Sequence, residues 1–315
     1  MTAKYIFMAL LLLPLTAKSN SDFSELELLF SQWRAFEAAP LHESAPDYRQ
    51  STFDHRRPQW KKFNEQLLAL DKSNWTVPEQ IDWFVMLAEL NGYQFNEQVL
   101  KPWARDPAFY KQVWTYKSDV PAHEGPTPHY VTELWTYDFP LNSAEQERLI
   151  TDLSRIKPLQ SQARLNLTGN AKELWIAGIR DIKEQHKVLT ELNAKVKETN
   201  NTQLLSVLQQ ATDSTAEFAQ WLEAQSAAKT GPSGLGEDQY TWYQQNVHLL
   251  PLNWQDEVRL LERELDRSWS TLKLEEHRNR DLPELVSVKN AEQYDALANR
   301  SAEYFLNFLE EKEGK

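Results

Sequence analysis

The amino-acid sequence predicts an all-α fold, built as a multi-helix array of antiparallel helix pairs. Only 8 of the 315 residues are glycine, and the composition is dominated by Leu, Glu, Gln, Ala and Lys, which favour helices. Apolar residues recur with the i, i+3, i+4, i+7 spacing of amphipathic helices. Alternation of apolar and polar residues, the pattern of a half-buried strand, is nearly absent.

The first 19 residues have the pattern of a secretory signal peptide. A basic start precedes an apolar run over residues 5–15, and small residues follow up to Ser19. A permanent membrane anchor is the weaker alternative, because the run is shorter than the roughly 20 residues that span a bilayer and is interrupted by Pro14. We therefore expect cleavage near Ser19 and a periplasmic or secreted protein of residues 20–315, with no membrane association after cleavage.

Composition and charge limit the classes of partner. The chain contains no cysteine, so no disulfide framework supports it and an apolar core must hold the fold. With 41% hydrophobic residues and 12 tryptophans, material for such a core is plentiful. The formal charge of −12 argues against nucleic acid and against anionic lipid as partners, and simple solubility explains it well.

Three amphipathic segments follow the leader. The first two are expected to be helices whose apolar faces point to the core. Their apolar residues are Phe23, Leu26, Leu29, Phe30 and Trp33 in the first, and Trp60, Phe63, Leu67, Leu68 and Leu70 in the second. In the third, Thr76 and Glu79 form a helix start, and the helix is expected to run through Leu90.

The middle of the chain contains an irregular connection and then more helices. Three prolines and a glycine exclude a helix over residues 119–128. Asn142 is expected to cap a helix that continues through Ile156 and ends near Pro158. Two long helical patterns follow, over about 171–196 and 204–221, and the short connection between them, with a turn at Asn200-Asn201, predicts antiparallel packing.

The last third begins with a glycine-rich loop, residues 230–236, which is expected to be tight and exposed. A short aromatic helix is expected over residues 238–247. Asn253 is expected to cap a helix through Leu272, and Asn290 to begin the last one.

No complete metal site is predicted. His123, Glu124 and His129 resemble the H-E-x-x-H signature of zinc peptidases, but the spacing is too long, and prolines forbid the helix that would direct both imidazoles to one metal ion. A metal site at His123 and His129 is therefore only a weak alternative to a structural loop. His186 is expected on a helix surface, and His277 lies within a charge run typical of a solvated face.

No nucleophile or phosphate loop is predicted either. The string GPSGLG lacks the Lys-Ser/Thr ending of a phosphate loop, and Ser233 is not set in G-x-S-x-G. The aromatic and polar residues that follow this loop are candidate substrate contacts, although core packing is the commoner use of such rings. The candidates are Tyr240, Tyr243, Asn246 and His248.

Several long strings resemble the bacterial domain-of-unknown-function 885 family, and they extend over nearly all of residues 20–315. They are ARDPAFY (104–110), DVPAHEGPTPH (119–129), ELWTYDFPL (133–141), NAKELWIAGIRDIKEQ (170–185), KTGPSGLGEDQYTWYQQNVHLLPLNWQDE (229–257) and LEEHRNRDLP (274–283).

This resemblance implies an all-helical, often secreted protein similar to zincin-type metallopeptidases. Members of the family carry their His-Glu pair and further His in a C-terminal half, for which the sequence has no counterpart. The resemblance therefore implies the N-terminal, substrate-side half of such a protein, inactive alone, with zinc expected only in a full-length relative. Its partners would be a peptide substrate or the missing C-terminal half. The alternative is a stand-alone periplasmic helical protein that binds peptides or acts as a scaffold.

Overall fold

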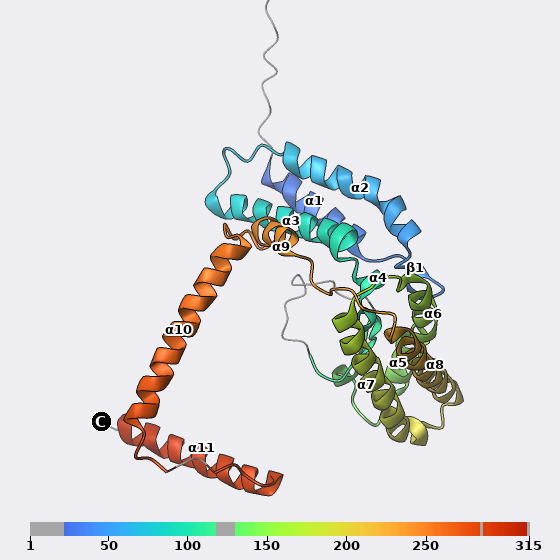
Figure 1. Cartoon of the computed structure of the whole chain (residues 1–315). Coiled ribbons are helices and arrows are strands. Elements are labelled where there is room, and N and C mark those ends of the chain that lie inside the picture. The colour runs from blue at the N-terminus through green and yellow to red at the C-terminus, as the bar shows by residue number, and fades with distance from the viewer. Residues whose placement is uncertain (1–21, 118–129, 284–285, 314–315) are drawn as a thin grey trace, which may run out of the picture. The chain divides into compact units, whose positions relative to one another are not determined.

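The computed structural model describes residues 22–117, 130–283 and 286–313, and the predicted signal peptide and the His123–His129 segment lie outside these ranges. The chain divides into two units, unit 1 (Met1–Trp254) and unit 2 (Gln255–Lys315). The described residues are mostly helical, which confirms the all-α prediction (Figure 1).

The α-helices of the described residues are α1 (Phe23–Glu37), α2 (Gln50–Ala69), α3 (Val77–Phe95), α4 (Pro102–Arg105), α5 (Ser143–Ser154), α6 (Ile156–Asn166), α7 (Lys172–Val196), α8 (Thr202–Ser226), α9 (Glu237–Asn246), α10 (Trp254–Arg278) and α11 (Ala291–Glu313). The other helical turns are the π-helix η1 (Asn96–Leu100) and the 3₁₀ turns η2 (Pro107–Tyr110), η3 (Leu134–Thr136) and η4 (Lys197–Thr199).

The strands are short and form two separate pairs. They are β1 (Leu41–His42) with β2 (Ala45–Pro46), antiparallel, and β3 (Val113–Trp114) with β4 (Thr132–Glu133), parallel. In register, Leu41 faces Pro46 and Val113 faces Thr132.

Helices α1, α2 and α3 pack on one another around a core rich in tryptophan (Figure 1). The start of α3 is capped as predicted: the backbone N–H of Thr76 donates to the carboxylate of Glu79 at 2.6 Å. Two residues that were expected in the core are exposed instead: Phe30 is 42% and Leu68 is 56% exposed. Each lies next in sequence to a buried leucine, so a step of about 100° places it at the edge of the apolar face rather than within it.

Helices α5 to α8 form the second group of packed helices (Figure 1). The predicted cap at Asn142 is present, since its side chain accepts from the N–H of Glu145 at 3.0 Å and its own N–H donates to that carboxylate at 2.9 Å. The predicted end near Pro158 is wrong. The first helix ends at Ser154, and Pro158 instead lies in the first turn of α6, where backbone N–H groups need no intrahelical partner.

Helices α7 and α8 form the predicted antiparallel pair. Their connection turns at Asn200, whose φ of 53° is left-handed, a conformation that asparagine tolerates. The side chain of Asn201 then accepts from the N–H of Leu204 at 3.1 Å and caps α8. The two asparagines therefore perform the reversal that the sequence predicted.

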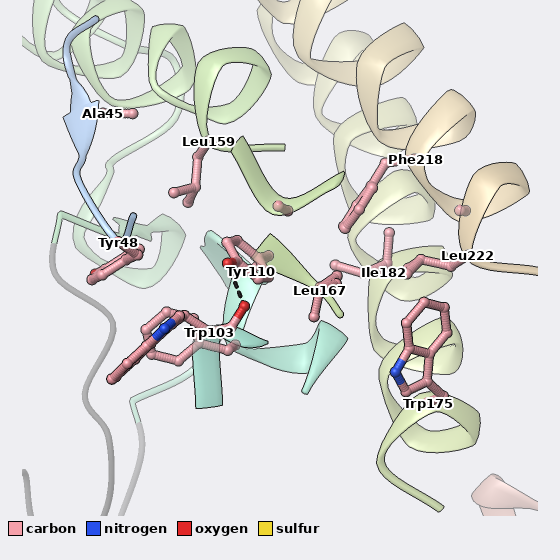
Figure 2. Close-up of a cluster of buried hydrophobic side chains, with 13 residues drawn as sticks. Ala45, Tyr48, Trp103, Tyr110, Leu159, Leu167, Trp175, Ile182, Phe218 and Leu222 are labelled. Carbon is pink, nitrogen blue, oxygen red and sulfur yellow. Dashed lines mark hydrogen bonds between the residues drawn. The ribbon is translucent and has the colours of Figure 1, made fainter. Parts of the chain in front are cut away.

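A third core cluster joins residues from Ala45 to Leu222, and Figure 2 shows its side chains converging from β2, α4, η2, α6, α7 and α8. At its centre the Tyr110 hydroxyl donates to the carbonyl of Trp103 at 2.6 Å. Gly178 lets η2 approach α7, because a Cβ there would lie 2.7 Å from the backbone nitrogen of Ala108.

Unit 2 consists of α10, apart from its first residue, and α11, and both helices begin near the predicted positions. No described residue of unit 2 is buried. Within the described ranges, no helix combines the length and the apolar character needed to cross a bilayer.

Candidate functional site

Unit 1 contains a cavity of about 400 Å³ whose walls are mainly apolar. Its aromatic lining comes from segments far apart in sequence, from the residues after β2 to α9. These rings belong to Tyr48, Phe53, Tyr93, Trp103, Phe109 and Tyr243. The volume lies within the range of small-ligand sites, and an apolar wall with a few polar groups is typical of them.

Aromatic rings of the lining pack on one another. Phe53 stacks on Trp103 with ring centroids 3.8 Å apart and an interplanar angle of 17°, and Tyr48 meets Phe109 edge to face at 4.7 Å. Figure 2 shows Tyr48 and Trp103 at the side of the buried cluster away from Phe218. The cavity therefore borders the third core cluster, which fixes these rings in place.

One carboxylate in the lining, Asp47, is held ionised by its neighbours. Burial alone would raise its pKa, but hydrogen bonds from Arg49 and Thr52 outweigh this and lower the pKa to about 2. The Arg49 guanidinium donates to both carboxylate oxygens at 2.8 and 2.7 Å, and the Thr52 hydroxyl donates at 2.7 Å. The ionised Asp47 carboxylate is therefore bound by its neighbours and stabilises this part of the cavity wall.

The arginine of the lining, Arg56, is also bound to other residues of the protein. Its guanidinium donates to the carbonyls of Phe36 and Ala38, at the end of α1, and lies 4.4 Å from the centre of the Phe36 ring. Burial, as the main cause, raises the pKa of the neighbouring Tyr93. The Tyr93 side chain is therefore neutral at ordinary pH.

The wall formed by α9 is seated on α3. The Trp242 ring lies parallel to that of Phe95, with centroids 5.6 Å apart, and Tyr243 contacts Phe95 at 4.8 Å. The Asn91 side chain donates to the carbonyl of Asn246 at 2.9 Å. This seating brings the Tyr243 side chain to the cavity.

Of the four predicted contact residues, only Tyr243 lines the cavity. Tyr240 packs edge to face on Trp254 at 5.3 Å, and Asn246 donates back to the carbonyl of Trp242 at 2.8 Å. His248 lies against Tyr243, 4.9 Å between ring centroids, with its Nδ1 3.1 Å from the Gln244 side chain. These three residues therefore support α9 and its C-terminal end rather than line the cavity.

Sequence reasoning missed most of the cavity. Five of its aromatic residues come from residues 48–109, and the packing of α9 on α3 brings Tyr243 next to them. Phe109 lies within the ARDPAFY string, but nothing in the local pattern distinguishes a cavity wall from a core residue.

The glycine-rich loop has a structural role that the sequence did not predict. The Ser233 hydroxyl accepts from the N–H groups of Glu173 and Leu174, at 3.0 and 3.1 Å, and donates to the Glu173 carboxylate at 2.9 Å. It therefore caps α7 from 60 residues away. Gly231 is required because a Cβ there would collide with the backbone oxygen of Asn170. The loop is thus only partly exposed, because it is docked on α7.

Metal-ligating side chains do not gather at one point in the described parts of the chain. Within these ranges, no group of three or more His, Asp or Glu side chains is placed to hold a metal ion. His186 lies half-buried on α7 and His277 is exposed on α10.

Comparison of the chain with family models, with curated proteins and with solved structures gave no match.

Proposed function

We propose that the chain is the N-terminal, substrate-side part of an exported zinc-metallopeptidase-like protein, and that its cavity binds an apolar side chain of a peptide. The observation that carries the proposal is the cavity of about 400 Å³ with aromatic walls inside unit 1. Its volume suits one large side chain and the adjoining backbone. The resemblance to the domain-of-unknown-function 885 family supplies the peptidase part of the proposal.

The polar groups of the lining fit a peptide better than a purely apolar ligand. The Asn96 side chain lines the cavity and makes no hydrogen bond to any described residue. Its amide offers one acceptor and two donors, which complement the N–H and C=O of a peptide group. Asp47 and Arg56 are bound within the protein, and Glu37 and Glu89 of the lining pair with Arg34. On this proposal, Asn96 orients the peptide and the aromatic rings bury its side chain.

Unit 2 supports the view that further protein packs on this chain. Its helices carry apolar stripes whose members include Leu261, Leu265 and Trp269, which are 67%, 61% and 55% exposed. Contiguous exposed apolar surface of this kind marks interaction sites in soluble proteins. On this proposal, a C-terminal half outside residues 1–315 covers the stripes and supplies the zinc ligands and the general base.

A stand-alone periplasmic peptide-binding protein is the second candidate function. It is favoured by the fact that every residue lining the cavity belongs to unit 1, so peptide binding would need no other chain. The two candidates differ at unit 2. A half-protein should self-associate through its apolar stripes, whereas a complete binding protein should run as a clean monomer in size-exclusion chromatography.

Peptide binding is tested by titrating the purified protein with peptides that differ at one aromatic or aliphatic side chain. Ala88 lines the cavity from α3, so Ala88→Phe should fill it and abolish binding. Ala224→Phe, on the exposed face of α8, is the matched control and should bind normally. Equal affinity of both variants would contradict the cavity as the peptide site.

The peptidase part has its own test. Incubation of the protein with zinc and a peptide library should give no cleavage, because zinc hydrolysis needs a coordinated water and a polarised carbonyl. Chelator-sensitive cleavage would show that residues 1–315 hold a complete site and would refute the half-protein proposal. Restoration of zinc-dependent cleavage by an added C-terminal half would support it.

A further inference from the structure

A second hollow of unit 1, formed by α2, the end of α3 and η1, carries cationic side chains on an acidic chain. It has a volume of about 430 Å³, and the formal charge of the chain is −12. Its lining consists of Arg57, Trp60, Lys61, Gln94, Gln98 and Lys101. None of these six side chains is a carboxylate. We propose that this hollow is a binding site for an oxyanion, either a phosphate or the carboxylate of a small molecule or peptide.

Two ammonium groups at the hollow have no partner among the described residues. The side chains of Lys61 and Lys101 make no ion pair or hydrogen bond with any residue that the structure describes. They differ in this from Lys183, which pairs with Glu223 across two helices, and from Lys273, which pairs with Glu276 at 2.7 Å. The positive charge at the hollow is therefore available to a ligand.

The third cation, Arg57, is held by carboxylates of the protein itself. The Nε and Nη2 atoms of Arg57 donate to the Glu97 carboxylate at 2.9 and 2.5 Å, and Nη2 also lies 3.2 Å from Asp54. Glu97 is only 2% exposed, so it anchors the guanidinium from the protein interior. Nη1 of Arg57 takes no partner among the described residues. A planar guanidinium held in this way loses little freedom when it binds an oxyanion.

Lys101 also has an unusual backbone conformation, which it shares with a few other non-glycine residues of the described ranges. Lys101 has φ 45° and ψ 57°, between the π-helix η1 and α4. This left-handed conformation is unfavourable for a residue with a Cβ, and glycine would adopt it more readily. Strained residues and π-helical turns concentrate at functional sites.

These groups match an oxyanion chemically. Charge-assisted hydrogen bonds from ammonium and guanidinium groups are stronger than neutral ones, and the side-chain amides of Gln94 and Gln98 add N–H donors. The nearby acids, Asp54 and Glu97, are both paired with Arg57. The two lysines therefore leave the hollow with a net positive charge.

The test is calorimetric titration of the purified protein at low salt with inorganic phosphate and, separately, with an acetylated tripeptide that has a free or an amidated C-terminus. We expect saturable binding that weakens as salt is added. The double variant Lys61→Gln/Lys101→Gln should lower the affinity roughly tenfold or more. Lys62→Gln, an exposed neighbour outside the lining, makes the same charge change and should leave the affinity within about twofold.

Lys101→Gly separates binding from folding. It removes the ammonium group and relieves the left-handed backbone, so the affinity should fall while the thermal midpoint stays unchanged or rises. Binding of phosphate, or of the free but not the amidated tripeptide, supports the site and identifies the source of the anion. The proposal is overturned if neither anion binds, or if binding is insensitive to Lys61 and Lys101. This result does not depend on peptide binding in the cavity.

Discussion

Helices α7 and α10 have the same length, 25 residues, and both carry an apolar stripe, yet they differ completely in burial. In α7, Trp175, Ile182 and Leu189 are at most 1% exposed, because η2 and α8 pack on the stripe. In α10, no residue is buried. An apolar stripe therefore predicts a helix and a face, but the cover for that face is a separate property of the tertiary structure.

The sharpest test of this difference is one substitution made in both helices. Leu189→Ala removes a fully buried side chain and should lower the free energy of unfolding by about 2–5 kcal/mol, because it leaves a cavity in the core. Leu265→Ala, at a position that is 61% exposed, should change it by less than about 0.5 kcal/mol. Urea unfolding monitored by circular dichroism measures both. Equal losses would mean that α10 is as well covered as α7.

Buried and exposed ion pairs should differ in their effect on stability in the same way as buried and exposed leucines. Asp47→Asn in unit 1 should destabilise the protein at pH 7 by about 1–2 kcal/mol, because the folded-state pKa of Asp47, about 2, lies below the ordinary value of 3.8. Such a depressed pKa stabilises the fold above about pH 4, and the effect is lost as the pH falls through about 2. The gap between wild type and variant should therefore close on acidification in denaturant titrations.

The matched control lies on α10. Glu275 pairs with Arg278 at 2.5 Å, but both side chains are about half exposed or more. Glu275→Gln should leave stability unchanged within error at every pH. A pH-dependent loss in this variant would show that an exposed pair of unit 2 contributes as much as the buried carboxylate of unit 1.

Helix caps should show a smaller effect. Ser233→Ala removes the cap that reaches α7 from the glycine-rich loop and should cost about 1 kcal/mol of global stability. Asn290 caps α11 locally, by accepting from the N–H of Gln293 at 2.9 Å. Asn290→Ala should reduce helix content slightly without moving the main unfolding transition. Hydrogen exchange at the first turns of α7 and α11 distinguishes the two.

The smallest effect is expected from removal of unit 2. All residues of the three core clusters lie between Leu26 and Leu222. Deletion of residues 255–315 should therefore leave the urea midpoint of unit 1 unchanged, since it removes no buried side chain. A large drop in the midpoint would mean that unit 2 covers part of unit 1 in solution.

Much of the fold was predictable because helix signals are local. The predicted caps at Thr76 and Asn142 depend on residues within one turn of them, and both are present. The error at Pro158 has the same origin: proline both ends helices and begins them, and the local pattern does not separate the two. Peptidase activity, export and zinc dependence remain predictions.

The candidate site was predictable only in part. Tyr243 was predicted to contact substrate because it lies in an aromatic cluster beside a glycine-rich loop; it lines the cavity, and its contact with a substrate stays a prediction. Tyr48 and Trp103 carry no such signal, because a ring in a cavity wall and a ring in a core have the same sequence pattern. The hollow at Lys101 was missed because its lysines lie 40 residues apart and meet only through the packing of α2 against α3.

The sequence by itself determined that the chain forms helices, where most of them begin, and which face of each is apolar, because propensity, capping and periodicity act within a few residues. The tertiary structure alone decided which stripes are covered, that Ser233 caps a helix 60 residues away, and which rings enclose the cavity. These properties depend on contacts between segments far apart in the chain, which no local pattern encodes.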